Sequence, residues 1–262
     1  MTDPLDVARH LAVPGRRCGL VTDFDGVLAP IVDDPAASAL LAGAAEVLTS
    51  LAGRLDVVAL LSGRPVGFLA ERAGLPGLLL LGSYGIESWE DGRARALPAV
   101  EAWRPAVAQA SERLHAAFDD AAGIHVEDKG LAVAVHWRRA PDQAAAQSLT
   151  TAVVDELAST LGLHREPGKL VQELRAPLQE DKGTALRRVV ADHGLQHVAY
   201  AGDDRGDLPA FAAVQELGGH ALVVHSPEVA PEVAAVPGAV FESPAAFLDW
   251  LRTLDGLLSE RG

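Results

Sequence analysis

Five short apolar runs, each followed by small or polar residues, constrain the fold of this chain more than any other feature. The runs are Gly19–Thr22, Val57–Leu61, Leu78–Leu81, Val198–Ala201 and Ala221–Val224. Each run has the length of a strand and is continuously apolar, and sequences of helical character separate most of them. Strands of a parallel sheet covered on both faces have this composition. The pattern predicts an α/β fold with a doubly wound, mainly parallel, Rossmann-like sheet.

The residues that follow these runs carry most of the chemically useful side chains. Asp23 follows the first run, Ser62-Gly63-Arg64 the second, and Gly202-Asp203-Asp204 the fourth. In open parallel sheets, ligands bind beyond the carboxyl ends of the strands. We therefore expect the functional site at this edge of the sheet.

The middle of the chain has a different pattern. It contains a helix-like stretch (101–118), two strand-like stretches within 123–138 around the turn Asp128-Lys129-Gly130, a second helix-like stretch (143–161) and a strand near Leu170. This order predicts a small α+β unit inserted into the core. We expect a cap domain at 98–173 and a catalytic core formed by 1–97 and 174–262.

The charge and cysteine content exclude several classes of protein. The 262 residues include 22 basic and 36 acidic side chains, a net charge of −14, which disfavours nucleic acid as a partner. Cys18 is the only cysteine, so no internal disulfide can form. The first residues do not resemble a signal peptide, and no apolar stretch has the length of a membrane span. We expect a soluble cytoplasmic protein that does not bind membranes.

The segment Asp23-Phe24-Asp25-Gly26 is the most informative motif. Two carboxylates at the end of a buried strand repel each other and lose hydration unless a positive group compensates them. A solvated turn is the alternative interpretation of this motif taken alone. Asp203 and Asp204 follow another buried run, and converging carboxylates make an oxygen-rich site that suits Mg²⁺.

The rarity of lysine is a second indication. Only three of the 22 basic residues are lysine, namely Lys129, Lys169 and Lys182, and the other 19 are arginine. A lysine retained in such a chain indicates a place that needs a compact ammonium, although so few examples can arise by chance. Ser62-Gly63-Arg64 offers a hydroxyl, backbone amides and a guanidinium to an anion, and the P-loop pattern is absent. Together these groups predict a site that removes a phosphoryl group.

Four motifs in this order resemble those of the haloacid-dehalogenase-like phosphatase superfamily. They are Asp23-Phe24-Asp25-Gly26, Ser62-Gly63-Arg64, Lys182-Gly183 and the segment from Gly202 to Asp207. Further segments are similar to the trehalose-6-phosphate phosphatase family, namely 23–31, 82–87, 127–129, 136–138 and 168–175. The resemblance covers nearly the whole chain.

The resemblance implies roles for the core residues. Asp23 would be the nucleophile that forms an aspartyl-phosphate, and Asp25 would be the general acid and base. Ser62 and Lys182 would bind the transferring group. Mg²⁺ would be held by Asp23, Asp25 through its backbone carbonyl, and Asp203, with Asp204 and Asp207 in supporting positions.

The resemblance also implies residues that bind the sugar. They are Arg64, Glu87, Glu127, Lys129, Arg138, Lys169 and Glu173. For Glu127 and Lys129 a solvated hairpin tip is the alternative, and packing is as good an explanation for His136 and Trp137 as substrate contact. The chain departs from the family pattern at Val27, Tyr84, Gly206 and Leu208, which leaves the sugar less defined than the reaction.

The expected activity is the Mg²⁺-dependent hydrolysis of trehalose 6-phosphate, the last step of trehalose biosynthesis, with a functional link to a trehalose-6-phosphate synthase. Two alternatives remain at this point. The chain could hydrolyse another sugar phosphate, such as sucrose 6-phosphate or a mannosyl phosphate. It could also be a sugar-phosphate-binding regulator without turnover.

Overall fold

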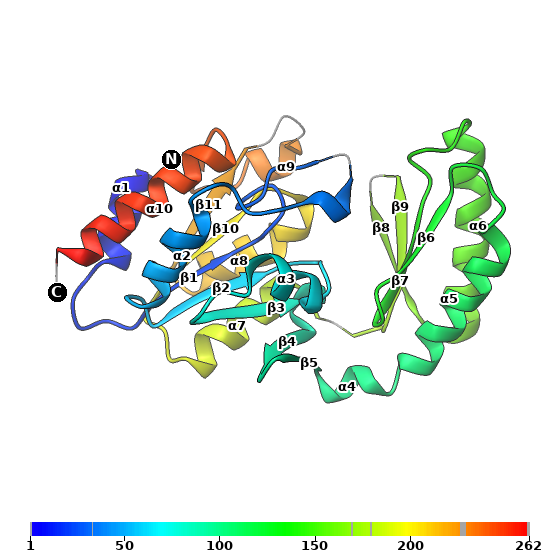
Figure 1. The fold of residues 1–262 in the computed structure, drawn as a ribbon, viewed down its shortest axis with the longest axis horizontal. Coiled ribbons are helices and arrows are strands. Elements are labelled where there is room, and N and C mark those ends of the chain that lie inside the picture. The colour runs from blue at the N-terminus through cyan, green and yellow to red at the C-terminus, as the bar shows by residue number, and fades with distance from the viewer. Residues whose placement is uncertain (1, 33, 169, 179, 226–228, 261–262) are drawn as a thin grey trace. The chain divides into compact units, whose positions relative to one another are not determined.

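A computed structural model describes residues 2–32, 34–168, 170–178, 180–225 and 229–260 (Figure 1). It contains two compact units, of which the first comprises Met1–Arg95 and Glu180–Gly262 and the second comprises Ala96–Gln179. Lys169, one of the predicted sugar-binding residues, lies outside the described residues.

The first unit contains an eight-stranded sheet in the order β12-β11-β10-β1-β2-β3-β4-β5. The strands are β1 (Cys18–Thr22), β2 (Val57–Leu61), β3 (Leu78–Gly82), β4 (Glu87–Glu90), β5 (Arg93–Ala96), β10 (His197–Gly202), β11 (His220–Val224) and β12 (Ala239–Phe241). The strands from β12 to β3 are parallel to their neighbours, and β4 is antiparallel to β3. The predicted fold class is confirmed, and the five apolar runs form β1, β2, β3, β10 and β11.

Helices cover both faces of this sheet. Alternate side chains of each strand point to opposite faces, and both sets are apolar, so both faces are buried under helices. Leu20 and Leu60 belong to the apolar cluster that one set of helices covers, whereas Val21 and Leu61 belong to the other. The first set is α1 (Pro4–Leu11), α2 (Ala44–Ala52), α3 (Val66–Ala73) and α10 (Pro244–Ser259). The second set is α7 (Lys182–Asp192), α8 (Leu208–Glu216) and α9 (Pro231–Ala234). Three 3₁₀ turns complete the described part of the unit, η1 (Pro35–Ala37), η2 (Ser83–Gly85) and η3 (Arg205–Asp207).

The topology defines where a ligand can bind. The chain runs outward from β1 through β2 to β3 on one side, and from β10 through β11 to β12 on the other. Successive strands thus lead away from β1 in both directions, and the carboxyl end of β1 lies where the direction changes. Ligands of doubly wound proteins bind at such a switch point.

The second unit is a four-stranded antiparallel sheet in the order β6-β7-β9-β8. Its strands are β6 (His125–Asp128), β7 (Ala132–His136), β8 (His164–Gly168) and β9 (Val171–Arg175), and its helices are α4 (Pro98–Glu101), α5 (Arg104–Phe118) and α6 (Gln143–Leu161). Val133, Val135 and Leu174 face α5 and α6 in one apolar cluster. The opposite face of the sheet carries Glu127 and Glu173.

Several details differ from the sequence-based expectations. The helix expected at 101–118 begins at Arg104, because Pro105 has no N–H and fits only the first turn. Leu170 lies outside both neighbouring strands with a positive φ of 59°, and β8 and β9 flank it instead of a single strand. The second unit extends beyond 98–173, since β9 continues to Arg175 in register with β7.

The sequence-based prediction did not include β4, β5 or β12. The first two lack a continuous apolar run, and β12 is apolar but only three residues long. Among the described helices, none combines the length and the hydropathy that crossing a membrane requires.

Candidate active site

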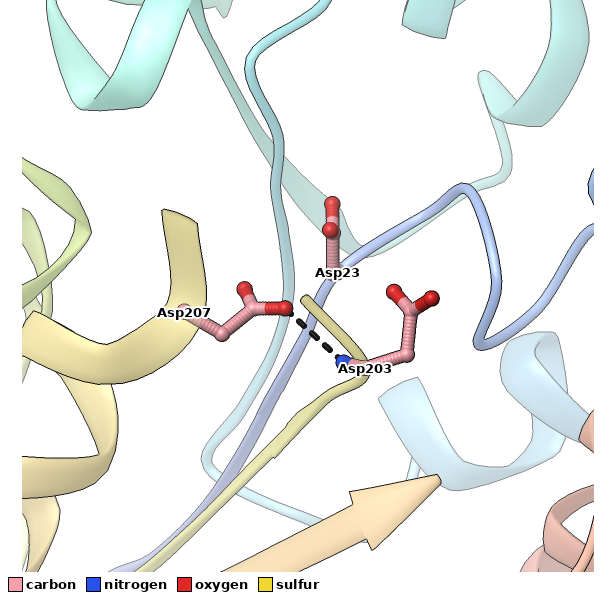
Figure 2. Close-up of side chains that lie close together, drawn as sticks. All are labelled: Asp23, Asp203 and Asp207. Atoms are coloured by element: carbon pink, nitrogen blue, oxygen red, sulfur yellow. Dashed lines mark hydrogen bonds between the residues drawn. The ribbon is translucent and has the colours of Figure 1, made fainter. Parts of the chain in front are cut away.

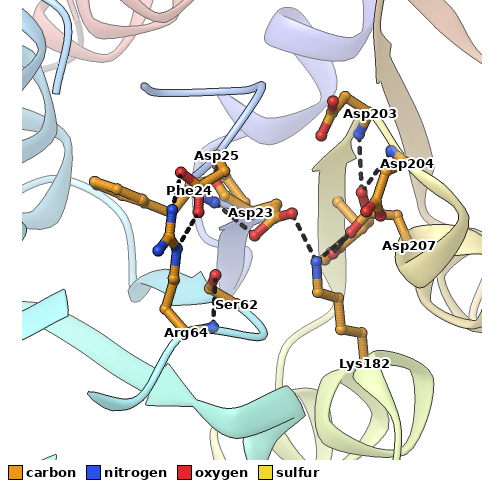
Figure 3. A network of polar contacts seen from close by, with 11 residues as sticks. Asp23, Phe24, Asp25, Ser62, Arg64, Lys182, Asp203, Asp204 and Asp207 are labelled. Atoms are coloured by element: carbon orange, nitrogen blue, oxygen red, sulfur yellow. Dashed lines mark hydrogen bonds and ion pairs between the residues drawn. The ribbon is translucent and has the colours of Figure 1, made fainter. Parts of the chain in front are cut away.

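The carboxyl ends of three neighbouring strands bring the sequence motifs together. Thr22 at the end of β1 pairs with Leu60 of β2 and with Ala201 of β10. The backbone N–H of Asp23 continues the ladder by donating to the carbonyl of Ala201 at 2.8 Å. The residues after each strand, including Ser62 and Asp203, therefore lie around Asp23 (Figure 3).

Asp23 is buried, with 5% of its surface exposed. Its Oδ1 accepts a 2.7 Å hydrogen bond from the backbone N–H of Phe24, and its Oδ2 accepts one of 2.7 Å from Lys182 Nζ. The Phe24 side chain is fully buried in the apolar cluster below and anchors the loop. Burial raises the pKa of Asp23 to about 7, although the charge of Lys182 opposes this shift.

Asp25 lies on the other side of the loop and has a different set of donors. Arg64 donates to both of its carboxylate oxygens, from Nε at 2.7 Å and from a terminal nitrogen at 3.0 Å. Ser38 adds a 2.7 Å hydrogen bond from its hydroxyl, and the Arg64 guanidinium lies 4.7 Å from the centre of the Phe68 ring. These contacts fix the orientation of the Asp25 carboxylate.

Lys182 is the first residue of α7, and a capping box between Asp181 and Thr184 fixes where this helix begins. Its ammonium is buried, with 3% exposure, and donates at 2.7 Å to Asp23 Oδ2 and at 2.7 Å to Asp207 Oδ1. Burial alone would lower the pKa of Lys182, but the charges of Asp207 and Asp23 raise it well above its ordinary value. The site therefore contains a permanent positive charge beside Asp23.

Asp207 is fully buried, and its carboxylate accepts four hydrogen bonds. Lys182 Nζ and the Tyr200 hydroxyl donate to Oδ1 at 2.7 and 2.5 Å, and the backbone N–H groups of Asp203 and Asp204 donate to Oδ2 at 2.8 and 3.0 Å. A carboxylate has about four acceptor positions. All of them are used, which leaves Asp207 no lone pair for a metal ion although it lies in the acidic cluster.

Asp203 is the exception in this cluster. It is 5% exposed, and within the described part of the chain no hydrogen bond reaches its carboxylate. Burial, followed by the charges of Asp23, Asp207 and Asp204, raises the pKa of Asp203 to about 9. Gly26 adopts a positive φ of 75°, and a Cβ there would lie 2.1 Å from Asp203 Oδ2, so glycine lets the first loop approach this carboxylate.

Oxygen atoms of Asp23, Asp203 and Asp207 lie within 4.8 Å of one another (Figure 2). The donors in this cluster are carboxylate oxygens, which suit a hard cation such as Mg²⁺. Because Asp207 is saturated, Asp23 and Asp203 are the side chains that fit such an ion. A buried carboxylate without a donor is favourable only when it is protonated or when a cation compensates its charge, and Mg²⁺ is such a cation.

Glu87, predicted to contact the sugar, is 8% exposed and faces the protein interior. Its Oε2 accepts hydrogen bonds from the backbone N–H of Val66 at 3.2 Å and the hydroxyl of Ser83 at 2.7 Å. Val66 is the first residue of α3, so Glu87 caps this helix and joins the loop after β2 to the loop after β3. These contacts hold Glu87 in place within the protein, and its contact with the sugar stays a prediction.

The loop after β3 is strained. Ser83 and Tyr84 adopt positive φ values of 50° and 62°, which are costly for residues with a side chain. Their backbone N–H groups donate to the carbonyls of Arg64 and Ser62 at 2.8 and 2.9 Å. A Cβ added at Gly63 would lie 2.9 Å from Tyr84 Cζ, so glycine at this position lets the Tyr84 ring approach the loop closely. The two loops thus determine each other's conformation.

Three of the predicted sugar-binding residues lie together in the second unit. Lys129 Nζ donates to Glu173 Oε2 at 2.5 Å, and Glu127 and Glu173 flank Ala134 on adjacent strands. His136, on the same face, pairs with Glu127 at 2.9 Å. Arg138 lies in the exposed turn after β7. This face of the sheet therefore carries charged groups around Ala134.

Sequence reasoning did not identify Tyr200, Ser38 or Phe68, each of which contacts a site residue. A tyrosine inside an otherwise apolar strand was the available signal for Tyr200. Nothing in the local sequence distinguished the other two, because their partners are distant along the chain.

The family model for trehalose-phosphatase matches residues 21–243. A trehalose-phosphate phosphatase of Mycobacterium marinum is 36% identical over 258 residues, which cover 96% of this chain and 64% of that protein. The chain thus spans less than two thirds of the length of this relative.

Two solved structures have a similar fold. One, of a trehalose-6-phosphate phosphatase related protein, has 22% sequence identity and a TM-score of 0.78, and the match covers 93% of this chain and 100% of the other. The C-terminal domain of Candida albicans trehalose-6-phosphate phosphatase has 22% identity and a TM-score of 0.74, and the match covers 97% and 95% of the two chains.

Proposed function

Because the chain belongs to the trehalose-phosphatase family, as its motifs predict, we propose that it hydrolyses trehalose 6-phosphate to trehalose and phosphate. The proposal includes Mg²⁺ as cofactor and an aspartyl-phosphate on Asp23 as intermediate. The observation that supports it most is the arrangement around Asp23, where a buried carboxylate lies between a fixed ammonium and a second carboxylate that lacks a donor.

In the first step, a carboxylate oxygen of Asp23 attacks the phosphorus of the substrate. The bond between phosphorus and the sugar oxygen breaks, and the carboxyl of Asp25 gives its proton to that leaving oxygen. Lys182 and the hydroxyl of Ser62 bind the phosphoryl oxygens as charge develops on them. Phe24 N–H keeps Asp23 Oδ1 oriented during this step.

In the second step, Asp25 takes a proton from water, and the resulting hydroxide attacks the same phosphorus. The bond to Asp23 breaks, which releases inorganic phosphate and restores the carboxylate. Asp23, Asp203 and the backbone carbonyl of Asp25 would hold Mg²⁺, which when bound neutralises negative charge on the phosphoryl oxygens. Asp207 orients Lys182 and the Asp203–Asp204 backbone through its four hydrogen bonds.

The second unit is proposed to select the sugar. Glu127, Lys129 and Glu173 present charged groups that suit vicinal hydroxyls, and such groups discriminate strongly between polar ligands. Arg138 and Lys169 are proposed for the same role. A reaction that supplies trehalose 6-phosphate must precede this one, so a functional link to a synthase of that sugar phosphate is part of the proposal.

The test is phosphate release from trehalose 6-phosphate beside sucrose 6-phosphate, glucose 6-phosphate and a mannosyl phosphate, with Mg²⁺ and with a chelator. We expect turnover that requires Mg²⁺ and favours trehalose 6-phosphate. Asp23→Asn should lower kcat by about 10³-fold or more, since it replaces the nucleophilic carboxylate with an uncharged amide.

Each part of the proposal fails separately. Preference for another sugar phosphate would overturn the assignment of trehalose 6-phosphate as substrate. Full activity in the presence of the chelator would overturn the assignment of Mg²⁺ as cofactor. Phosphate release that persists in Asp23→Asn would identify a different nucleophile.

A further inference from the structure

Tyr200 is a buried polar residue to which the reaction gives no role. It lies in β10, three residues before Asp203, and is fully buried. Its ring packs edge-on against Phe211, with 5.6 Å between the ring centres. Tyrosine usually keeps its hydroxyl near water, so complete burial requires a hydrogen-bond partner.

That partner is Asp207, whose Oδ1 accepts the Tyr200 hydroxyl at 2.5 Å. The same oxygen accepts Lys182 Nζ at 2.7 Å. Tyr200 therefore donates from within the sheet to the oxygen that orients the catalytic ammonium. Without this donor, one acceptor position of a fully buried carboxylate would lack a partner, which is unfavourable.

The position of Lys182 depends on this arrangement. Two of its three N–H bonds point to Asp23 and Asp207, which leaves the third for a phosphoryl oxygen. If Asp207 rotates, the direction of that third hydrogen changes. The backbone at Asp203 and Asp204 changes with it, because both N–H groups donate to the other oxygen of Asp207.

We propose that Tyr200 is a positioning residue for phosphoryl transfer, whose hydroxyl fixes Asp207 and thereby Lys182 and the Asp203 backbone. This role rests on the proposed phosphatase function but not on the identity of the sugar. It predicts that Tyr200 affects the chemical step and the metal site, and that it does so through Asp207.

Tyr200→Phe is the direct test, because it removes one oxygen and keeps the ring. We expect kcat to fall by about 10- to 100-fold, the usual cost of losing such an outer contact, with KM nearly unchanged. The loss should be the same for trehalose 6-phosphate and for p-nitrophenyl phosphate, which has no sugar. Phe247→Leu, at a fully buried phenylalanine of α10, is the control for destabilisation and should leave kcat unchanged.

A double-mutant cycle of Tyr200→Phe with Asp207→Asn tests whether Tyr200 acts through Asp207. Since Tyr200 acts through Asp207, Tyr200→Phe should cost little more once Asp207 is replaced. Full additivity of the two losses would overturn the proposal, as would wild-type kcat in Tyr200→Phe.

The failure of the proposed function is distinguishable from the failure of this inference. A wild-type protein that hydrolyses only p-nitrophenyl phosphate refutes the sugar substrate, and the cycle can still be measured with that compound. If neither compound is hydrolysed, the inference about Tyr200 is tested by calorimetric titration of the wild-type protein and of Tyr200→Phe with Mg²⁺. A roughly tenfold weaker affinity in Tyr200→Phe supports the inference, and equal affinity in the two proteins overturns it.

Discussion

At the scale of single residues, Lys182 shows why a lysine persists in a chain whose other basic residues are nearly all arginine. Its ammonium is buried between two carboxylates at 2.7 Å each. A guanidinium is planar and larger, and it cannot direct a single compact charge to both oxygens in this space. A positive charge alone is therefore not sufficient at position 182, because the charged group must also be small enough to bind both carboxylates.

We expect Lys182→Arg to lower kcat by about 10²- to 10³-fold, the usual cost of losing a donor that stabilises developing charge. Lys182→Met should be similarly impaired. Arg187→Lys, an exposed exchange of the same two residue types on α7, is the matched control and should retain wild-type kcat. Activity is measured by phosphate release at saturating substrate, and near-normal turnover in Lys182→Arg would contradict the assigned geometry.

The raised pKa values of Asp23 and Asp203 predict how pH affects metal binding. Burial raises them to about 7 and about 9, so protons compete with Mg²⁺ at both carboxylates below these values. We expect the affinity for Mg²⁺ to increase about tenfold per pH unit between pH 7 and 9, and more steeply below pH 7. Titration calorimetry in buffers of different ionisation enthalpy should detect the released protons.

The same shifts affect stability. An acid whose pKa is higher in the folded than in the unfolded state binds more protons when folded, so it stabilises the fold at low pH. That contribution is lost as pH rises from about 4 through about 7 for Asp23 and about 9 for Asp203. The increase in Tm that Mg²⁺ produces should therefore grow from pH 6 to pH 9 and should be much smaller in Asp203→Asn. A pH-independent increase in Tm would argue against these carboxylates as ligands.

At the scale of structural elements, the loops after β2 and β3 form one unit that Glu87 joins. The strained φ values of Ser83 and Tyr84 persist because backbone hydrogen bonds to Ser62 and Arg64 hold them. Glu87 fixes the same two loops through Ser83 and Val66. The orientation of Ser62 and Arg64 thus depends on a residue of a neighbouring strand.

Glu87→Ala should lower kcat/KM by about tenfold or more, because it leaves two hydrogen-bond donors of the buried loops without their acceptor. The loss should be equal for trehalose 6-phosphate and p-nitrophenyl phosphate, since the change acts on the loops and not on the sugar. Glu87→Gln, which keeps an acceptor oxygen, should recover part of the activity. Glu90→Ala, in the same strand but exposed, is the control. A loss confined to the sugar substrate would instead support the predicted contact of Glu87 with the sugar.

At the scale of the whole molecule, the chain is divided between a unit with the proposed reacting groups and a unit with charged groups on a sheet face. The first contains Asp23 and Lys182, and the second contains Glu127 and Glu173. The proposed division of labour therefore separates the chemistry from the choice of sugar.

Glu127→Ala should reduce kcat/KM for trehalose 6-phosphate by about 10- to 100-fold, the effect of losing a hydrogen bond to a charged group. Turnover of p-nitrophenyl phosphate should hardly change. Glu156→Ala, at an exposed acid on α6, removes a carboxylate from the same unit and should affect neither substrate. Equal losses on both substrates in Glu127→Ala would contradict the division of labour.

The sequence by itself determined the fold class and the edge of the sheet where the site lies. A short, continuously apolar run bounded by turn residues is typical of a buried strand, and parallel strands end at the same edge, so β1, β2 and β10 were expected to bring Asp23, Ser62 and Asp203 together. Three strands were not predictable because their pairing depends on neighbouring strands, namely β4 and β5, which lack such a run, and β12, which has only three residues. β8 was not predictable either, because its polar composition does not indicate a strand that pairs with β9.

Only the tertiary structure decided what each carboxylate does. Asp203 and Asp207 are both acidic residues near the end of one strand, yet Asp207 accepts four hydrogen bonds and the carboxylate of Asp203, within the described residues, accepts none. Two of those donors, Lys182 and Tyr200, come from another helix and from inside the sheet. A side chain's role depends on which distant groups donate to it, and local sequence does not contain that information.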